Sequence, residues 1–334
     1  MHTNEFMLRK ALVSIILAIF LLATITPSLA QNNVDSATIH QKAVQYLVNN
    51  YNSKIGLIPE TNNSPTYWLV SDNLLAYYAL RNDDPTISNE IAATLKNYVN
   101  SNNLPHDSNG LPISYKHEAL IGDVLPDVFR NSSQSNGSSL INGSNYSIVT
   151  EVDNYTQMND WTSYADLLAL RGISLFNQGN ISGATDNYNA MIKMWDGNGF
   201  ADKPFLNPNS QSYHIYQTYK IGLALILSND LNIVNASVNN RVENIIASLQ
   251  QSNGGVITGY VLVNGSIVPS VSATANTETT AIIALANVKD NYPFPSGNPT
   301  QEVVIVSFTV ACISFTIVYL VRKVQIIAKT KTKR

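Results

Sequence analysis

The stretch Trp161–Leu175, WTSYADLLALRGISL, decides the fold that the sequence predicts. An aromatic residue opens it, and a Leu-Leu-Ala core begins six residues later, at Leu167. The C-terminal half is apolar nearly all round, which is typical of a buried helix rather than a surface helix. Three further segments repeat a similar apolar core, two of them with an aromatic residue six positions before it, and predict a repeated inner helix. They are Tyr67–Leu80, Tyr216–Leu227 and Asn276–Ala286.

More polar, amphipathic segments alternate with the inner ones and predict outer helices. They are Ala37–Tyr51, Thr86–Asn100, Gly183–Trp195 and Val238–Gln251. A glycine loop follows each outer segment, as a helix C-terminus favours. Strand-like alternation is scarce, apart from a short hairpin expected near Gly255–Val263. The sequence therefore predicts an all-α fold of antiparallel helical hairpins in one domain, residues 31–286.

Both ends of the chain are apolar and predict its location. Residues 1–30 have a charged start, an apolar run and Ser28-Leu29-Ala30 before Gln31, the layout of a secretory signal peptide. Val303–Val321 holds no charge and is long enough for a transmembrane helix. A Pro/Gly/Asn stalk, 287–302, precedes it, and the basic tail 322–334 follows. The expected partner is a membrane, crossed once, with the tail cytoplasmic and the preceding domain outside.

Composition excludes several function classes for the exterior region. Residues 31–302 carry 22 Asp and Glu against 12 Lys and Arg, which argues against binding nucleic acid. The only cysteine, Cys312, lies in the predicted membrane helix, so the exterior has neither disulfides nor thiol chemistry. No phosphate-binding glycine loop, nucleophile elbow or zinc-helix motif is present. We therefore expect no nucleotide, no cofactor and no metal.

N-glycosylation sequons lie between the two apolar ends and agree with an exported protein. A Ser/Asn/Gly-rich stretch, 131–148, holds four of them and predicts a loop that is either disordered or covered with glycan. The predicted glycosylation sites are Asn62, Asn131, Asn136, Asn142, Asn145, Asn154, Asn180, Asn235 and Asn264.

The repeated hairpins resemble the α/α-toroid proteins. The turn Gln250–Gly255 followed by Thr279–Leu285 looks like the repeats of terpenoid cyclases and six-hairpin glycosidases, and Trp68–Ala76 is similar to inner helices of sugar-active toroids. The resemblance implies an incomplete or small toroid, because about four units are visible where a closed glycosidase ring has six. The Asp-rich metal motif of the cyclases is absent. The dense sequons and missing disulfides also resemble membrane-anchored archaeal surface proteins.

Aromatic residues at the start of the inner helices are the candidate sugar-binding groups, because aromatic faces stack on sugar rings. Trp68 and Asp72 are four residues apart and share a helical face, and Tyr216 and Lys220 repeat that spacing. The alternative is that these aromatics are repeated packing residues. The candidate substrate-binding residues are Trp68, Trp161, Tyr164, Tyr216 and Lys220.

Carboxyl groups inside apolar helices are the candidate catalytic groups. Asp72, Asp166 and Glu278 are each in such a helix, where burial would raise a carboxyl pKa. Glycoside hydrolysis needs two carboxyl groups across the scissile bond. The alternative is a set of hydrogen-bonded buried acids. Further candidates are Glu60, Asp160 and Asp202, of which Asp160 also fits a helix N-cap.

Two His-acid pairs, His106-Asp107 and His117-Glu118, offer a possible base or metal ligand. Their spacing matches no established ligand signature and favours a solvated loop. The sequence as a whole predicts a surface protein that binds or processes carbohydrate, and as an enzyme it would be a glycoside hydrolase or polysaccharide lyase. The competing prediction is a non-catalytic, glycosylated scaffold or adhesion module.

Overall fold

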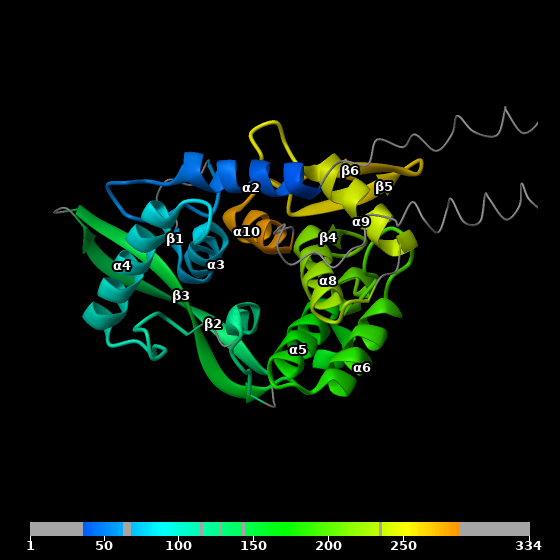
Figure 1. Ribbon diagram of the computed structural model, residues 1–334, viewed down its shortest axis with the longest axis horizontal. Helices are drawn as coiled ribbons and strands as arrows, with labels where there is room; N and C mark the ends of the chain where they lie inside the picture. Colours follow the sequence, from blue (N-terminus) through cyan, green and yellow to red (C-terminus); the bar gives the residue numbers. More distant parts are fainter. Residues whose placement is uncertain are drawn as a thin grey trace, which may run out of the picture. The chain divides into compact units, whose positions relative to one another are not determined.

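A computed structural model describes residues 36–62, 68–113, 116–126, 129–141, 144–233 and 236–286 (Figure 1). The chain divides into two compact units, 1–289 and 290–334, and every described residue belongs to the first. The predicted signal peptide, stalk, membrane segment 303–321 and basic tail lie outside the described residues. Within the described ranges, no helix is both long enough and apolar enough to cross a membrane.

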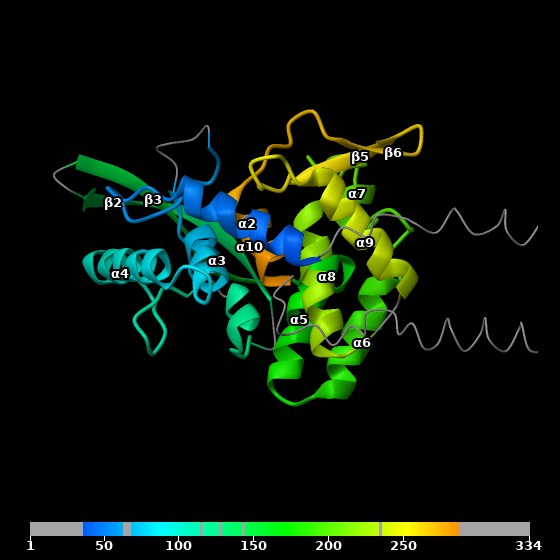
Figure 2. The same cartoon turned by 45° about the horizontal axis from the view of Figure 1, so that its top comes forward.

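Four inner helices form at the four repeated segments. They are α3 (Val70–Leu80), α5 (Ala165–Asn177), α8 (Thr218–Asp230) and α10 (Thr277–Ala286). α10 packs against both α3 and α8, and α5 packs against α8. Both views accordingly show α10 between α3 and α8 (Figure 1 and Figure 2). The first turns of all four helices carry polar or charged side chains, which matters for the site below.

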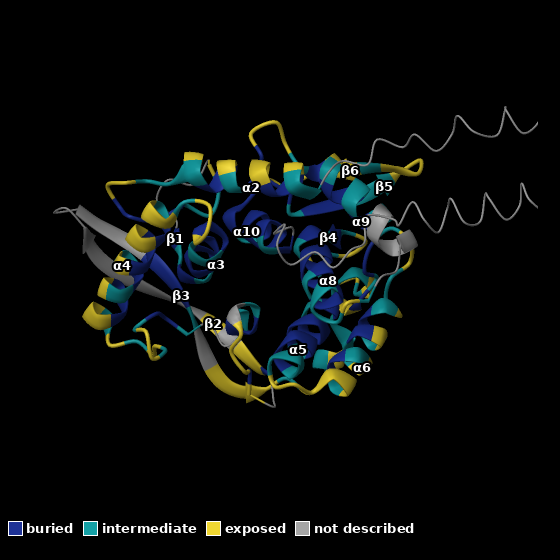
Figure 3. Ribbon diagram, in the orientation of Figure 1, coloured by how far each residue is buried: buried dark blue, intermediate teal, exposed yellow. Residues whose placement is uncertain are grey.

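Amphipathic outer helices cover the inner ones. They are α2 (Ser36–Asn50), α4 (Pro85–Asn102), α6 (Ile181–Ile192) and α9 (Ala236–Leu249). α2 packs on α10, α4 on α3, and α6 on α5. Figure 3 shows α2 and α4 with buried residues on one side and exposed residues on the other, as their apolar spacing requires. Three short helices complete the set: η2 (His117–Ile121), η3 (Trp161–Ser163) and α7 (Lys203–Leu206).

Two three-stranded sheets show that the expectation of an all-α fold, built as an incomplete or small α/α toroid, is wrong. The first sheet has the order β1-β3-β2, from β1 (Trp68–Leu69), β2 (Arg130–Ile141) and β3 (Ser144–Gln157). The second has the order β4-β5-β6, from β4 (Tyr216–Gln217), β5 (Gly259–Val263) and β6 (Ser266–Pro269). The fold is mixed α/β, with the short strands β1 and β4 running directly into α3 and α8.

The Ser/Asn-rich stretch 131–148 was expected to be a loop, but it forms most of the β2–β3 hairpin instead. β3 pairs in parallel with β1, through Trp68 with Ile148 and Leu69 with Val149. The Tyr98 hydroxyl of α4 donates to the carbonyl of Ile148 at 3.2 Å. Ser, Asn and Gly have low intrinsic preference for strands, so pairing and packing make this hairpin, and neither is visible in a local window.

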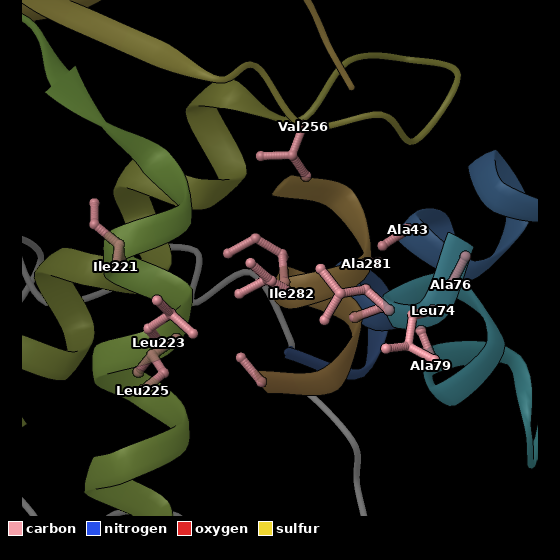
Figure 4. Packing of buried hydrophobic residues seen from close by; sticks show 14 of the residues in the cluster. Ala43, Leu74, Ala76, Ala79, Ile221, Leu223, Leu225, Val256, Ala281 and Ile282 are labelled. Carbon is pink, nitrogen blue, oxygen red and sulfur yellow. The ribbon is translucent and has the colours of Figure 1, made fainter. Parts of the chain in front are cut away.

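The apolar core lies where α2, α3, α8 and α10 meet (Figure 4). Ile282 of α10 lies between Leu223 of α8 and Leu74 of α3, and all three side chains are buried. Each such side chain contributes roughly 1.5–3 kcal/mol by leaving water. Gly222 lets α8 approach α10, because a Cβ there would lie 2.7 Å from Ile282 Cγ2. The core thereby fixes the relative positions of the inner helices.

Gly254 provides a test of how the α9 turn docks on α2. Its φ is +92°, and a Cβ there would lie 1.9 Å from the backbone oxygen of Lys42. We expect Gly254→Ala to lower the free energy of unfolding by roughly 2–4 kcal/mol in urea titrations, because backbone must move. Gly265→Ala is the control, since φ is +79° there with no described atom within 4 Å of the Cβ. Equal losses in both variants would contradict the close approach.

Candidate active site

Three acidic side chains occupy the first turns of three inner helices. They are Asp72 on α3, Asp166 on α5 and Glu278 on α10. Glu278 interacts electrostatically with both of the others. The three predicted catalytic carboxyl groups therefore lie in the first turns of their helices, with Asp72 and Asp166 each within electrostatic range of Glu278.

Two further acids, Glu60 and Glu151, complete what we call the acidic cluster: Glu60, Asp72, Glu151, Asp166 and Glu278. Both interact electrostatically with Glu278. The Glu60 carbonyl accepts a hydrogen bond from the backbone N–H of Thr277 at 2.9 Å, so its loop is tied to the start of α10. Glu151 arrives on β3, two residues beyond the pairing of Val149 with β1. A loop and a strand thus add two carboxyl groups to the three that the helices carry.

Glu278 is the acid best suited to proton transfer. Burial, followed by the negative charges of Glu151 and Asp166, raises the pKa of its carboxyl to about 7. Its side chain is nevertheless 32% exposed. The carboxyl group is therefore desolvated by the surrounding protein while part of its side chain still meets solvent. Glu278 is therefore placed to exchange its proton with a bound molecule near neutral pH.

Asp72 is the most enclosed member of the acidic cluster. Its residue is 1% exposed, and burial, followed by the charges of Glu278 and Glu60, raises the pKa of its carboxyl well above the usual range. The Ser71 hydroxyl approaches Oδ1 at 3.4 Å. Among the described residues, Oδ2 has no hydrogen-bond partner. A buried polar atom left in this state usually signals strain, a functional role or an unseen ligand.

Asp166 lies beside two donor side chains of α8. The Tyr219 hydroxyl donates to Oδ2 at 2.9 Å, and the Lys220 ammonium lies 3.6 Å from Oδ1. Lys220 itself is 2% exposed and donates to Asp202 Oδ2 at 2.5 Å. Asp202 also accepts from the backbone N–H of Ala165, at the start of α5. Lys220 is thus an internal counter-ion rather than an open substrate ligand.

His117 belongs to the site, against the expectation of a solvated loop. Its Nε2 lies 3.8 Å from Glu278 Oε1, and its side chain is 13% exposed. Burial and the neighbouring Lys116 ammonium lower the pKa of the imidazole to about 4, so it is neutral at pH 7. In the second His-acid pair, His106-Asp107, the histidine side chain is exposed to solvent. Within the described ranges, no three His, Cys, Asp or Glu side chains are grouped to hold a metal ion.

The aromatic candidates for sugar binding lie mostly in the protein interior. Trp68 and Tyr216 are buried, with Tyr216 stacked between Phe205 and Tyr260. Half-buried Trp161 packs against the Phe129 ring at 5.4 Å. The face of Tyr164 is 5.7 Å from the Lys203 ammonium, which pairs with Asp160. These contacts favour the packing interpretation and place Asp160 at the surface.

Five of the nine predicted glycosylation sites have a described exposure, and all five are at the surface. The exposed ones are Asn62, Asn131, Asn154, Asn180 and Asn264. Asn180 additionally caps α6, because its side-chain oxygen accepts from the backbone N–H of Gly183. Asn142 and Asn235 lie outside the described residues, and the side chains of Asn136 and Asn145 are not described. Attachment of glycan at any of these positions stays a prediction.

Sequence reasoning missed two residues of the site, Tyr219 and Glu151, and expected a third, His117, in a solvated loop. Tyr219 had a signal, because it occupies the same repeat position as Tyr164, three residues before the Gly222 and Leu167 cores. Glu151 had no such signal, since it reaches the site through the pairing of β3 with β1.

Comparison with known proteins adds no assignment: no protein-family model, no curated protein and no solved structure matches this chain.

Proposed function

We propose that this protein hydrolyses glycosidic bonds, with Glu278 as the general acid and Asp166 as the partner carboxylate. This reaction requires one protonated carboxyl group to protonate the leaving oxygen and one carboxylate to activate water or attack the sugar. The observation that carries the proposal is Glu278, whose carboxyl pKa is raised to about 7 by burial and by the charges of Glu151 and Asp166 while its side chain stays 32% exposed. A general acid works best when its pKa lies near the working pH.

The surrounding side chains support this division of roles. Tyr219 and Lys220 position the Asp166 carboxyl group, through the 2.9 Å hydrogen bond and the 3.6 Å ion pair. Asp166 Oδ1 is buried, accepts no hydrogen bond from the described residues and lies 3.6 Å from the Lys220 ammonium. The neutral imidazole of His117 has its Nε2 3.8 Å from Glu278 Oε1, and Glu278, with a side chain that is 32% exposed, regains its proton from solvent water after the reaction.

A second candidate, a non-catalytic surface scaffold, is favoured by one observation. Trp68 and Tyr216 are buried and offer no open faces for a sugar ring. On this account the acidic cluster would be a costly structural feature, kept without chemistry. In either case we propose that the domain works outside the cell and is anchored to the membrane, on the sequence pattern of its ends alone.

The pH dependence of hydrolysis separates these candidates. We expect the purified full-length protein to release reducing ends from an oligosaccharide panel, with kcat/KM falling above pH of about 7 as Glu278 loses its proton. Asp230→Asn is the matched control. Burial raises the pKa of Asp230 to about 6, but it lies at the far end of α8, ten residues and ~15 Å from Lys220.

The control variant should keep the alkaline limb of the wild-type profile. If no member of a panel covering neutral, amino and acidic sugars is cleaved at any pH between 4 and 9, the hydrolase proposal fails and the scaffold remains.

A further inference from the structure

A cavity of about 480 Å³ opens between η3 and α7. Thr162 and Ser163 line it from η3. Leu206 lines it from the last turn of α7, and Asn207 follows that helix directly. The volume lies within the roughly 300–1,000 Å³ that is typical of small-molecule sites in proteins. This η3–α7 cavity therefore has room for one sugar unit.

Apolar side chains form part of the lining. Leu206 is 61% exposed, and Met194 and Ala201 are half-buried. The backbone N–H of Ala201 donates to the carbonyl of Met194 at 2.8 Å, which holds these two residues side by side. Because most of the Leu206 side chain still meets water, it gains little from folding and remains able to cover a ligand. The C–H face of a sugar ring offers an apolar surface of this kind.

The polar groups of the lining supply both donors and acceptors. The hydroxyl groups of Thr162 and Ser163 can each donate and accept. Asn207 Oδ1 accepts from the backbone N–H of Asn209 at 3.0 Å, which holds the amide in place and leaves its Nδ2 to donate to a ligand. Sugar hydroxyl groups likewise donate and accept, and they therefore match this lining.

Both charged residues of the lining already have a counter-ion. Lys203 pairs with Asp160 at the surface, and the buried carboxylate of Asp202 pairs with the Lys220 ammonium at 2.5 Å. A charged ligand would have to compete with these pairs, whereas a neutral ligand leaves both intact. The lining therefore favours a neutral molecule that is rich in hydroxyl groups.

Asp202 connects the η3–α7 cavity with the proposed active site. Its Oδ2 accepts from the backbone N–H of Ala165 at 3.0 Å, one residue before Asp166, and from the Lys220 ammonium. The same ammonium group lies 3.6 Å from Asp166 Oδ1. One buried ammonium group thus separates a carboxylate of the cavity lining from the partner carboxylate of the proposed reaction.

We propose that the η3–α7 cavity binds one neutral sugar unit of a glycan. The inference deepens the proposed hydrolysis by naming its substrate class, and it rests on that hydrolysis for the role of the bound glycan. The ring would lay its C–H face on Leu206 and Met194 and direct its hydroxyl groups to Ser163 and Asn207. A purely apolar ligand would leave these polar groups unpaired, which is costly.

Saturation-transfer difference NMR with the full-length protein measures this binding. The probes are the methyl glycosides of glucose, galactose and mannose, which are neutral, with glucosamine as the cation and glucuronate as the anion. We expect at least one neutral glycoside to bind with a Kd on the order of 1 mM, about fivefold or more below the Kd of either charged sugar. If no neutral glycoside binds below about 10 mM, or if a charged sugar binds more tightly, the inference is overturned.

Two substitutions in the lining locate the bound sugar. Leu206→Ser removes apolar surface, and Asn207→Asp removes the amide donor but keeps an acceptor for the N–H of Asn209. Each should weaken binding of the neutral glycoside by about fivefold or more.

Matched controls make the same chemical changes outside the cavity lining. Ile181→Ser alters an apolar residue of α6 that is 49% exposed, and Asn209→Asp alters an exposed amide two residues beyond Asn207. Both should bind the glycoside as the wild type does. Equal affinity in the lining variants and the controls would place the sugar elsewhere and overturn the inference.

Cleavage assays on neutral oligosaccharides separate this inference from the proposed hydrolysis. The lining variants should raise KM for a cleaved oligosaccharide severalfold, because they lose ground-state binding. Cleavage with an unchanged KM in both lining variants would overturn the inference and leave the hydrolase standing. Binding that depends on the lining, without cleavage of any oligosaccharide, would retain the cavity as a sugar site and refute the hydrolase.

Discussion

Replacing Glu278 with glutamine is expected to lower kcat/KM for glycosidic cleavage by about 10²–10⁴-fold, the usual effect of a general acid. Glutamine keeps the size and polarity of the side chain but has no acidic proton to transfer. The measurement is the initial rate of reducing-end release at pH 6, where the wild-type carboxyl group is protonated. Asp230→Asn, at the far end of α8, is expected to retain the wild-type rate.

The same variant should be more stable than the wild type at alkaline pH. The pKa of Glu278 is raised from 4.5 to about 7 by folding, so the native state holds this proton more tightly than the unfolded chain does. The wild type therefore loses stability as pH rises from about 4.5 to about 7, relative to Glu278→Gln. At pH 8 we expect a gain of about 2 kcal/mol in the variant, reduced by the partial exposure of Glu278.

The two readouts together distinguish a catalytic from a structural Glu278. Loss of activity with a gain in alkaline stability is the pattern of a strained functional group. An inactive variant that is also less stable at pH 8 would show that Glu278 supports the fold, and that its inactivity says nothing about proton transfer.

Lys220→Met is expected to destabilise the protein by about 3–5 kcal/mol, the second large effect. The Lys220 ammonium is 2% exposed and neutralises buried Asp202 at 2.5 Å, with Asp166 at 3.6 Å. Methionine fills a similar volume but leaves these carboxylates without their counter-ion. Urea unfolding at pH 7 measures the loss.

A double variant gives the matched control for this ion pair. Lys220→Met with Asp202→Asn removes both charges, while the amide oxygen can still accept from the N–H of Ala165. Most of the lost stability should return. A loss below about 1 kcal/mol in the single variant, or no recovery in the double variant, would contradict the buried ion pair.

The inner helices were predictable because their signal is local. A short core such as Leu-Leu-Ala or Ile-Ile-Ala, with apolar residues all round, is typical of a buried helix, and each of the four segments forms a helix. The catalytic candidates followed from the same pattern. An acid such as Asp72 or Glu278 within an apolar helix is costly, and the structure groups these acids at the helix starts.

The rest of the site depends on contacts between distant residues. Glu151 reaches the acidic cluster only because β3 pairs with β1, some eighty residues earlier in the chain. His117 faces Glu278 across 161 positions of sequence, through the packing of η2 against α5 and α3. The burial of Trp68 and Tyr216 could not be predicted either. An aromatic residue at a repeat position gives the same local pattern whether it packs in the core or stacks on a sugar ring.

The most direct test of the central claim is a titration of the Glu278 carboxyl group in the folded, full-length protein. Carbon-13 NMR of glutamate-labelled wild type, with the Glu278 signal assigned by its loss in Glu278→Gln, gives the pKa itself. Proton transfer by Glu278 at neutral pH requires a midpoint of about 7. A midpoint near 4.5 would show an ordinary ionised carboxylate and would contradict its role as the general acid.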